Sequence, residues 1–112
     1  MDKNNRAIGD TLEKKVMYLL QMRGTHNSGA TNDDADLKDD HMIVECKVKS
    51  KMAGLGISAS LLEKVKKQAL KWRREWAIVT RNADGDEFVT VPLNDFAEYY
   101  ISWRGCTEKA PL

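Results

Sequence analysis

DLKDDHMIVECK, residues 36–47, holds an aspartate, a polar turn and an apolar run that is typical of a β-strand. Side chains alternate between the two faces of a strand. Glu45 and Lys47 therefore share one face, and the apolar residues between and beside them share the other. If Asp36 ends the preceding strand beside the turn, its carboxylate comes close to that of Glu45. The segment thus predicts two carboxylates and an ammonium group in one place.

Such a pair of carboxylates predicts a metal site. The two groups repel each other unless a cation lies between them, and oxygen ligands without a His or thiol cluster favour Mg²⁺, with Mn²⁺ as a substitute. Lys47 would then stabilise an anion or orient a water that attacks a phosphate, which indicates metal-assisted phosphodiester hydrolysis. The alternative is an amphipathic edge strand whose outer face carries Glu45 and Lys47 without a chemical role.

Length and composition indicate one small domain, residues 1–112. With 42% hydrophobic and 31% charged residues, we expect a soluble globular protein. The chain begins with mixed charges and no long apolar run follows, so we expect a cytoplasmic protein without a signal peptide or membrane association. Cys46 and Cys106 lack paired spacing and His partners, which predicts free thiols and not zinc ligands.

Charge is unevenly distributed, although the formal net charge is only +1. Residues 33–45 hold six acids and one base, whereas residues 47–74 hold nine bases and one acid. An acidic site beside a basic surface suits a nuclease, because a metal needs carboxylates and a phosphate backbone needs cations. The alternative is a solvated basic helix face. The lysines that we consider for nucleic-acid binding are Lys49, Lys51, Lys64, Lys66, Lys67 and Lys71.

The segment before residue 36 predicts a helix and then a polar loop. Apolar residues at helical spacing predict an amphipathic helix over about 4–22. Glu13 lies at the edge of its buried face, where it is either a surface charge or leans over a neighbouring sheet. Residues 25–34 predict a short strand and an exposed loop. His26 and Ser28 are candidates there for phosphate contacts, although a polar loop needs no such role.

A second helix follows the strand of residues 36–47. Ser60 to Glu63 has the form of a capping box, which predicts a helix over about 60–73. Gln68 falls on its apolar stripe, where it either satisfies a backbone group or reaches the metal site.

The remaining elements complete a sheet. The expected order is helix, three strands, helix, two strands and helix, which predicts an α/β (α+β) fold with a central mixed five-stranded sheet flanked by helices. A loose tail is expected after residue 105. Besides the strand near residue 25, the patterns predict strands at 35–38, 41–49, 76–80 and 88–91, a turn at 82–86 and a short helix at 94–102.

This arrangement resembles the PD-(D/E)XK nuclease superfamily, and within it the archaeal-type Holliday junction resolvases and related small phage nucleases. The resemblance covers about residues 7–92 and depends on the element order, Glu13, Ser28, Asp36 and Glu45-x-Lys47. It implies a restriction-endonuclease-like core and a Mg²⁺-dependent endonuclease of branched or double-stranded DNA in recombination and repair, in a prokaryotic or phage-infected cell. Resolvases of this type resemble one another in being homodimers, because a four-way junction needs two symmetric cuts.

The resemblance also implies roles for single residues. Asp36 and Glu45 would bind the divalent ion together with the backbone carbonyl of Cys46. Lys47 would position or activate the attacking water. Glu13 would approach the metal directly or through water.

Two further residues match the family, and the sequence also differs from the family pattern at some positions. Ser28 would lie near the scissile phosphate, and Gln68 resembles a glutamine that several branches carry on the helix after the catalytic strand. The family's first aspartate usually follows a proline, whereas Asp36 follows an alanine, and only eight residues separate it from Glu45. A different loop fold would make one of the aspartates at positions 33 and 34 the ligand in its place.

Three functions compete. The first is a structure-selective endonuclease, above all a Holliday junction resolvase. The second is a nicking, restriction-like or DNA-processing nuclease of the same fold. The third is a non-catalytic DNA-binding module, which the set of Asp36, Glu45 and Lys47 disfavours, because a binding surface gains nothing from carboxylates that repel phosphate.

Overall fold

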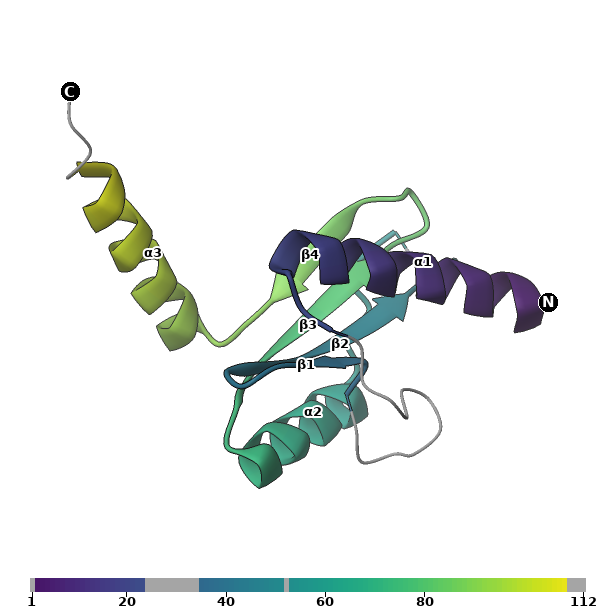
Figure 1. The fold of residues 1–112 in the computed structure, drawn as a ribbon. Helices are drawn as coiled ribbons and strands as arrows, with labels where there is room; N and C mark the ends of the chain where they lie inside the picture. Colours follow the sequence, from purple (N-terminus) through teal and green to yellow (C-terminus); the bar gives the residue numbers. More distant parts are fainter. Residues whose placement is uncertain (1, 24–34, 52, 109–112) are drawn as a thin grey trace.

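The computed structural model describes residues 2–23, 35–51 and 53–108 of the chain (Figure 1). The strand expected near residue 25, and the loop that holds His26 and Ser28, lie outside these described residues. None of the described helices combines the length and the hydrophobicity that crossing a membrane requires. The elements follow in the order α1 (Asp2–Leu20), β1 (Leu37–Lys38), β2 (Met42–Val48), α2 (Ala59–Trp72), β3 (Glu75–Arg81), β4 (Glu87–Thr90) and α3 (Leu93–Glu108).

The strands form one mixed sheet in the order β1-β2-β3-β4. The outer pairs β1–β2 and β3–β4 are antiparallel, while β2 and β3 are parallel and are joined through α2. Parallel neighbours need such a crossover, and it places the helix on one face of the sheet. The predicted mixed sheet flanked by helices is confirmed, with four strands in place of five among the described residues.

The two faces of β2 pack under different helices, which Figure 1 shows on opposite sides of the sheet. Val44 belongs to an apolar cluster with Leu12 and Val16 of α1, whereas Ile43 packs with Val65 of α2. The predicted alternation is therefore confirmed, with Glu45 and Lys47 on the α2 side. The reading of this segment as an edge strand with a solvated charged face is wrong, because β2 is an inner strand and α2 covers that face.

Helix α2 begins earlier than the sequence indicated. Ser58 is the N-cap, and its Oγ accepts a hydrogen bond of 3.1 Å from the backbone N–H of Leu61. The predicted capping box of Ser60 and Glu63 is therefore wrong. The helix ends at Arg73, which adopts a left-handed conformation with φ of 55°. This end turns the chain directly into β3.

Helix α3 is longer than predicted and lies apart from the sheet (Figure 1). It runs from Leu93 to Glu108, whereas the sequence indicated a short helix at 94–102 and a loose tail after Gly105. Its first turn is closed by a hydrogen bond of 3.0 Å from the N–H of Phe96 to the carbonyl oxygen of Pro92. A proline just before a helix costs no internal hydrogen bond, which explains the sharp start.

Candidate active site

Asp36 is fixed against β2 by the backbone. Its Oδ2 accepts a hydrogen bond of 2.8 Å from the N–H of Cys46, the residue after Glu45. The short spacing to Glu45 is possible because Asp39 closes the intervening turn, where its Oδ1 accepts hydrogen bonds of 2.8 Å from the N–H groups of His41 and Met42. The aspartate that the sequence indicated is thus placed beside the glutamate of the strand.

Glu45 is the buried member of the carboxyl pair, with 3% of its surface exposed. Burial raises the pKa of Glu45 to about 8, and the hydrogen bond to the side chain of Asp36 and its charge add to this rise. Near pH 7 the metal-free protein therefore keeps a proton between the two groups, as expected when two carboxyls share one site without a cation.

Two lysines surround the carboxyl of Glu45. The charges of Lys64 and Lys47 both counter the rise in its pKa. Nζ of Lys64 lies 3.9 Å from Oε2 of Glu45, an ion-pair distance too long for a hydrogen bond. That oxygen is buried and has no hydrogen-bond partner among the described residues. The sequence assigned Lys64 to the DNA surface, but the structure places it over the carboxyl pair.

The buried side of α2 continues from Lys64 to Gln68 and Trp72, at intervals of one helical turn. Gln68 is buried, as its position on the apolar stripe predicted. Nζ of Lys38 lies 3.9 Å from the centre of the Trp72 ring, in a cation–π contact. The same spacing that identified Gln68 could have identified Lys64, which stands three residues after the buried Leu61.

Glu13 approaches from the other face. It is partly buried on α1, and its charge acts on the thiol of Cys46, which points to that side. Burial raises the pKa of this thiol far above its usual range, and the charges of Asp36, Glu13 and Glu45 add to the rise. The thiol is therefore protonated, which leaves only the backbone carbonyl of Cys46 as a ligand. Both cysteines are free, as predicted.

The carboxyl pair suits a hard divalent cation. Within the described part of the chain, no three His, Cys, Asp or Glu side chains group around one metal position. Mg²⁺ is usually held by one or two carboxylates and keeps several waters or phosphate oxygens. Asp36 and Glu45 match that requirement, and the buried Oε2 of Glu45 lacks the partner that a cation would supply.

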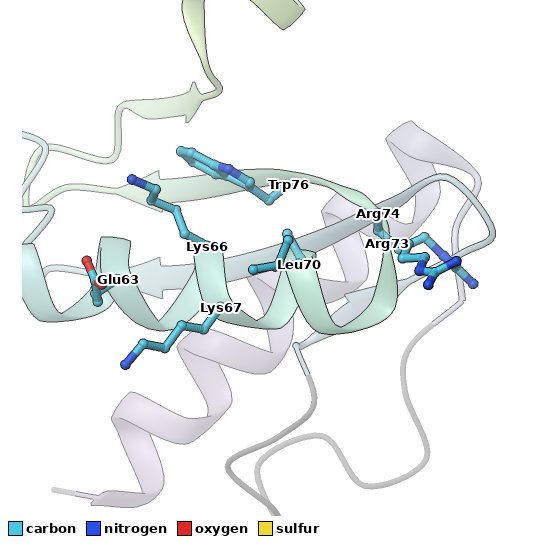
Figure 2. Close-up of a pocket in the computed structure, with 8 residues that line it drawn as sticks. Glu63, Lys66, Lys67, Leu70, Arg73, Arg74 and Trp76 are labelled. Carbon is cyan, nitrogen blue, oxygen red and sulfur yellow. The ribbon is translucent and has the colours of Figure 1, made fainter.

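A basic groove of about 510 Å³ lies between α2 and the start of β3 (Figure 2). Lys66 and Lys67 line it, as the predicted DNA surface requires. Lys71 lies instead 5.3 Å from the centre of the Trp72 ring, while Lys49 and Lys51 follow β2. The sequence pattern did not indicate a site at the remaining lining residues, which are Glu63, Ala69, Leu70, Arg73, Arg74 and Trp76.

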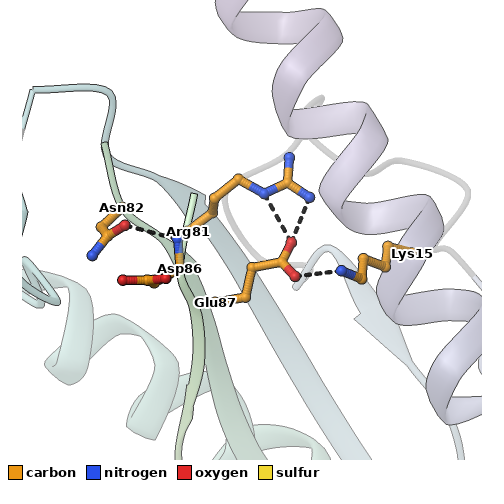
Figure 3. A network of polar contacts seen from close by, with 5 residues as sticks. All are labelled: Lys15, Arg81, Asn82, Asp86 and Glu87. Carbon is orange, nitrogen blue, oxygen red and sulfur yellow. Dashed lines mark hydrogen bonds and ion pairs between the residues drawn. The ribbon is translucent and has the colours of Figure 1, made fainter. Parts of the chain in front are cut away.

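A polar network holds α1 against the end of the sheet (Figure 3). Glu87 of β4 accepts hydrogen bonds from Lys15 of α1 and, at 2.8 Å, from Nε of Arg81. These hydrogen bonds lower the pKa of Glu87. Asn82 closes the following turn, because its Oδ1 accepts hydrogen bonds of 3.0 Å from the N–H groups of Asp84 and Asp86. The network has a structural role and lies outside the carboxyl pair.

Comparison with known proteins agrees with this architecture. No family model and no curated protein matches the chain. Among solved structures, the chain is similar to Hjc, a Holliday junction resolvase from the archaeal hyperthermophile Archaeoglobus fulgidus. The TM-score is 0.55 over 75% of each chain, at 14% sequence identity. At this identity the likeness establishes the fold, and the chain has the restriction-endonuclease-like fold of that resolvase.

Proposed function

We propose that the chain is a divalent-metal-dependent endonuclease that hydrolyses phosphodiester bonds in branched DNA, and more specifically a Holliday junction resolvase. The observation that carries this proposal is the pair of carboxyls formed by Asp36, just before β1, and Glu45 on β2. The similar Hjc fold supports the choice of substrate. A pure DNA-binding module would gain nothing from burying a glutamate that opposes phosphate.

The metal would be held by Asp36, Glu45 and the backbone carbonyl of Cys46. Mg²⁺ is the expected ion, with Mn²⁺ as a substitute, because all these ligands are oxygens. When bound, the ion would polarise the scissile phosphate and lower the pKa of a bound water. The carboxyl pair must release its proton for the ion to bind, so metal affinity increases with pH.

The surrounding side chains have separate roles. Lys47, on the same face of β2 as Glu45, orients the attacking water. Lys64 would pair with Glu45 when that carboxyl is ionised and no metal is bound, and would pair with a phosphate oxygen once the metal is bound. Gln68, one turn further along α2, positions the water or the phosphate. Glu13 would act on the ion through a bound water, since its charge acts on the neighbouring Cys46 from the α1 side.

The DNA backbone would lie along basic residues of α2 and of the segment after β2. Cations there replace the counterions of the phosphates, which gives affinity without sequence preference. His26 and Ser28, in the loop outside the described residues, are proposed phosphate contacts. The basic residues of this surface are Lys49, Lys51, Lys66, Lys67, Lys71, Arg73 and Arg74.

The test is a cleavage assay on an end-labelled four-way junction, a flap and a linear duplex of matched sequence, with Mg²⁺ or with EDTA. Wild type is compared with Glu45→Gln and with Asp84→Asn, which changes an exposed acid in the turn between β3 and β4. We expect paired, Mg²⁺-dependent cuts in the junction from wild type and Asp84→Asn, and none from Glu45→Gln. Cuts in flap or linear DNA would support nuclease activity but refute the preference for junctions. Unchanged cutting by Glu45→Gln would refute the assignment of Glu45 to the active site.

A further inference from the structure

The groove between α2 and the start of β3 is basic at both ends and apolar in the middle. Figure 2 shows Lys66 and Lys67 toward one end, Arg73 and Arg74 at the other, and Leu70 between them. Because an α-helix rises 1.5 Å per residue, Lys66 and Arg73 lie roughly 10 Å apart along the helix axis. An occupant that satisfies both ends therefore carries more than one negative charge.

The cations of the groove are not neutralised by acids. Glu63 is the single acid among the lining residues, beside four bases. Lys66, Lys67 and Arg73 are exposed, and none of them forms an ion pair within the described part of the chain. The positive excess attracts a polyanion.

Arg74 is fixed at its end of the groove. Its Nε donates a hydrogen bond of 2.9 Å to the carbonyl oxygen of Asp39, and its Nη1 donates one of 2.6 Å to the carbonyl oxygen of Trp72. A guanidinium group that is already held in place loses little side-chain freedom when an anion binds. This end of the groove is thus preorganised for a phosphate.

Charge alone does not account for the middle of the groove. Leu70 is 81% exposed, and Trp76 of β3 is only partly buried although it packs against the core under α2. The backbone of a duplex presents phosphates and sugars, which give an apolar surface nothing to pack against. An unpaired base has a free π-face, and such bases stack on aromatic side chains in grooves that also carry cations. The groove therefore suits a strand with unpaired bases.

A second copy of the chain fits this groove less well. In a two-fold contact the same surface patch lies on both subunits. The four bases of one groove would then lie near the four bases of the other, and like charges oppose association.

The groove is separate from the carboxyl pair. Lys64 lies over Glu45, on the edge of α2 toward β2, whereas Lys66 and Leu70 line the groove toward β3. Val65, between these two edges, is fully buried against the sheet. A strand in the groove therefore leaves the carboxyl pair open to another phosphate.

We propose that the groove binds an unpaired, single-stranded segment of the branched DNA on which the nuclease acts, an inference that rests on the function proposed above. A base packs against Trp76 and Leu70, and the phosphates on either side of it pair with the cations at the two ends. The volume of about 510 Å³ lies in the range of pockets that hold small ligands, so a base and its sugar have room there.

The test measures binding of single strands to the full chain by fluorescence anisotropy, in EDTA so that no strand is cut. The probes are a short oligothymidylate and an abasic strand of the same length, which carry the same phosphates and differ in their bases. The phosphate contribution is common to both. We expect at least tenfold tighter binding of oligothymidylate, about 1.4 kcal/mol, which stacking on one aromatic side chain can supply. Equal affinity for the two strands would overturn the proposal.

Single variants assign the base contact to the groove. Trp76→Leu keeps an apolar side chain without the ring, and Leu70→Ser changes an exposed position that folding does not need. Both should bind the abasic strand as wild type does and lose most of the preference for oligothymidylate, whereas Trp76→Phe should keep it. The matched controls Trp103→Leu and Leu93→Ser, at exposed positions of α3, should keep the full preference. A preference that survives both Trp76→Leu and Leu70→Ser would place the bases on another surface and overturn the proposal.

Two further outcomes separate this groove from other roles. Self-association of wild type that is lost in Leu70→Ser, without any preference for oligothymidylate, would assign the groove to a second copy and overturn the proposal. Since the binding assay contains no metal, a base preference in a protein that never cleaves DNA would support the groove and refute the nuclease. Cleavage without a base preference would do the reverse.

Discussion

Replacing Glu45 with glutamine should stabilise the metal-free protein at alkaline pH. The substitution keeps the size of the side chain and a hydrogen bond to Asp36, but removes a group that must ionise in a buried position. The pKa of Glu45 is raised from 4.5 to about 8, so between these values the folded state holds a proton that the unfolded state releases. Stability is therefore lost as the pH rises through this window.

The size of the effect follows from the shift. Each pKa unit corresponds to about 1.4 kcal/mol, so wild type should lose about 3 kcal/mol relative to Glu45→Gln between about pH 5.5 and pH 8. Titrating groups that do not interact with Glu45 are common to both proteins and cancel in the difference. Added Mg²⁺ should restore wild type more at pH 8 than at pH 5.5, because the ion replaces the proton.

Chemical denaturation of both proteins at each pH, with EDTA and with Mg²⁺, gives the free energies of unfolding. Glu63→Gln serves as the control, because Glu63 is exposed. If the free energies of unfolding of wild type and Glu45→Gln change in parallel with pH, burial does not raise the pKa of Glu45. If Mg²⁺ raises the free energy of unfolding of Glu45→Gln as much as that of wild type, the ion binds at another position.

Three further perturbations test neighbouring residues. Asp36→Asn should abolish Mg²⁺-dependent cleavage while junction binding, measured by gel shift, is kept; retained cleavage would exclude Asp36 as a ligand. Lys64→Met should bind Mn²⁺ more tightly, measured by calorimetry, because the Lys64 ammonium no longer competes with the ion for Glu45. The variant should also cleave more slowly at saturating metal. An Mn²⁺ affinity equal to that of wild type would refute the ion pair of Lys64 with Glu45. Replacing Lys66 and Lys67 with glutamate should weaken DNA binding and make its salt dependence shallower, since fewer counterions are released. If affinity depends on salt concentration as steeply as in wild type, these lysines do not contact the DNA.

The sheet and the position of the carboxyl pair could be predicted because they depend on local rules. The period-two pattern of residues 42–48 fixes which side chains share a face, and a parallel neighbour requires a crossover helix. Asp36 could be placed beside Glu45 because a turn of so few residues leaves few alternatives. The expected strand near residue 25 lies outside the described residues.

Features that depend on tertiary contacts were predicted less well. Ser58 and Ser60 are both good N-caps, and local sequence favoured Ser60 through Glu63, while the fold uses Ser58. The extent of α3 was underestimated because its apolar residues lie on several faces and Gly105 resembled an end. The contact of Lys64 with Glu45 depends on how α2 sits across the sheet, which no local pattern specifies.

The most direct measurement is an anomalous difference map from crystals of the full chain grown with Mn²⁺. The account predicts one strong peak within bonding distance of the carboxyl oxygens of Asp36 and Glu45 and of the carbonyl oxygen of Cys46, with Lys64 withdrawn from Glu45. The same map from Glu45→Gln should lack the peak. A wild-type map with no peak at the pair, from protein that cleaves DNA in the same buffer, would contradict the central claim that these two carboxyls form the metal site.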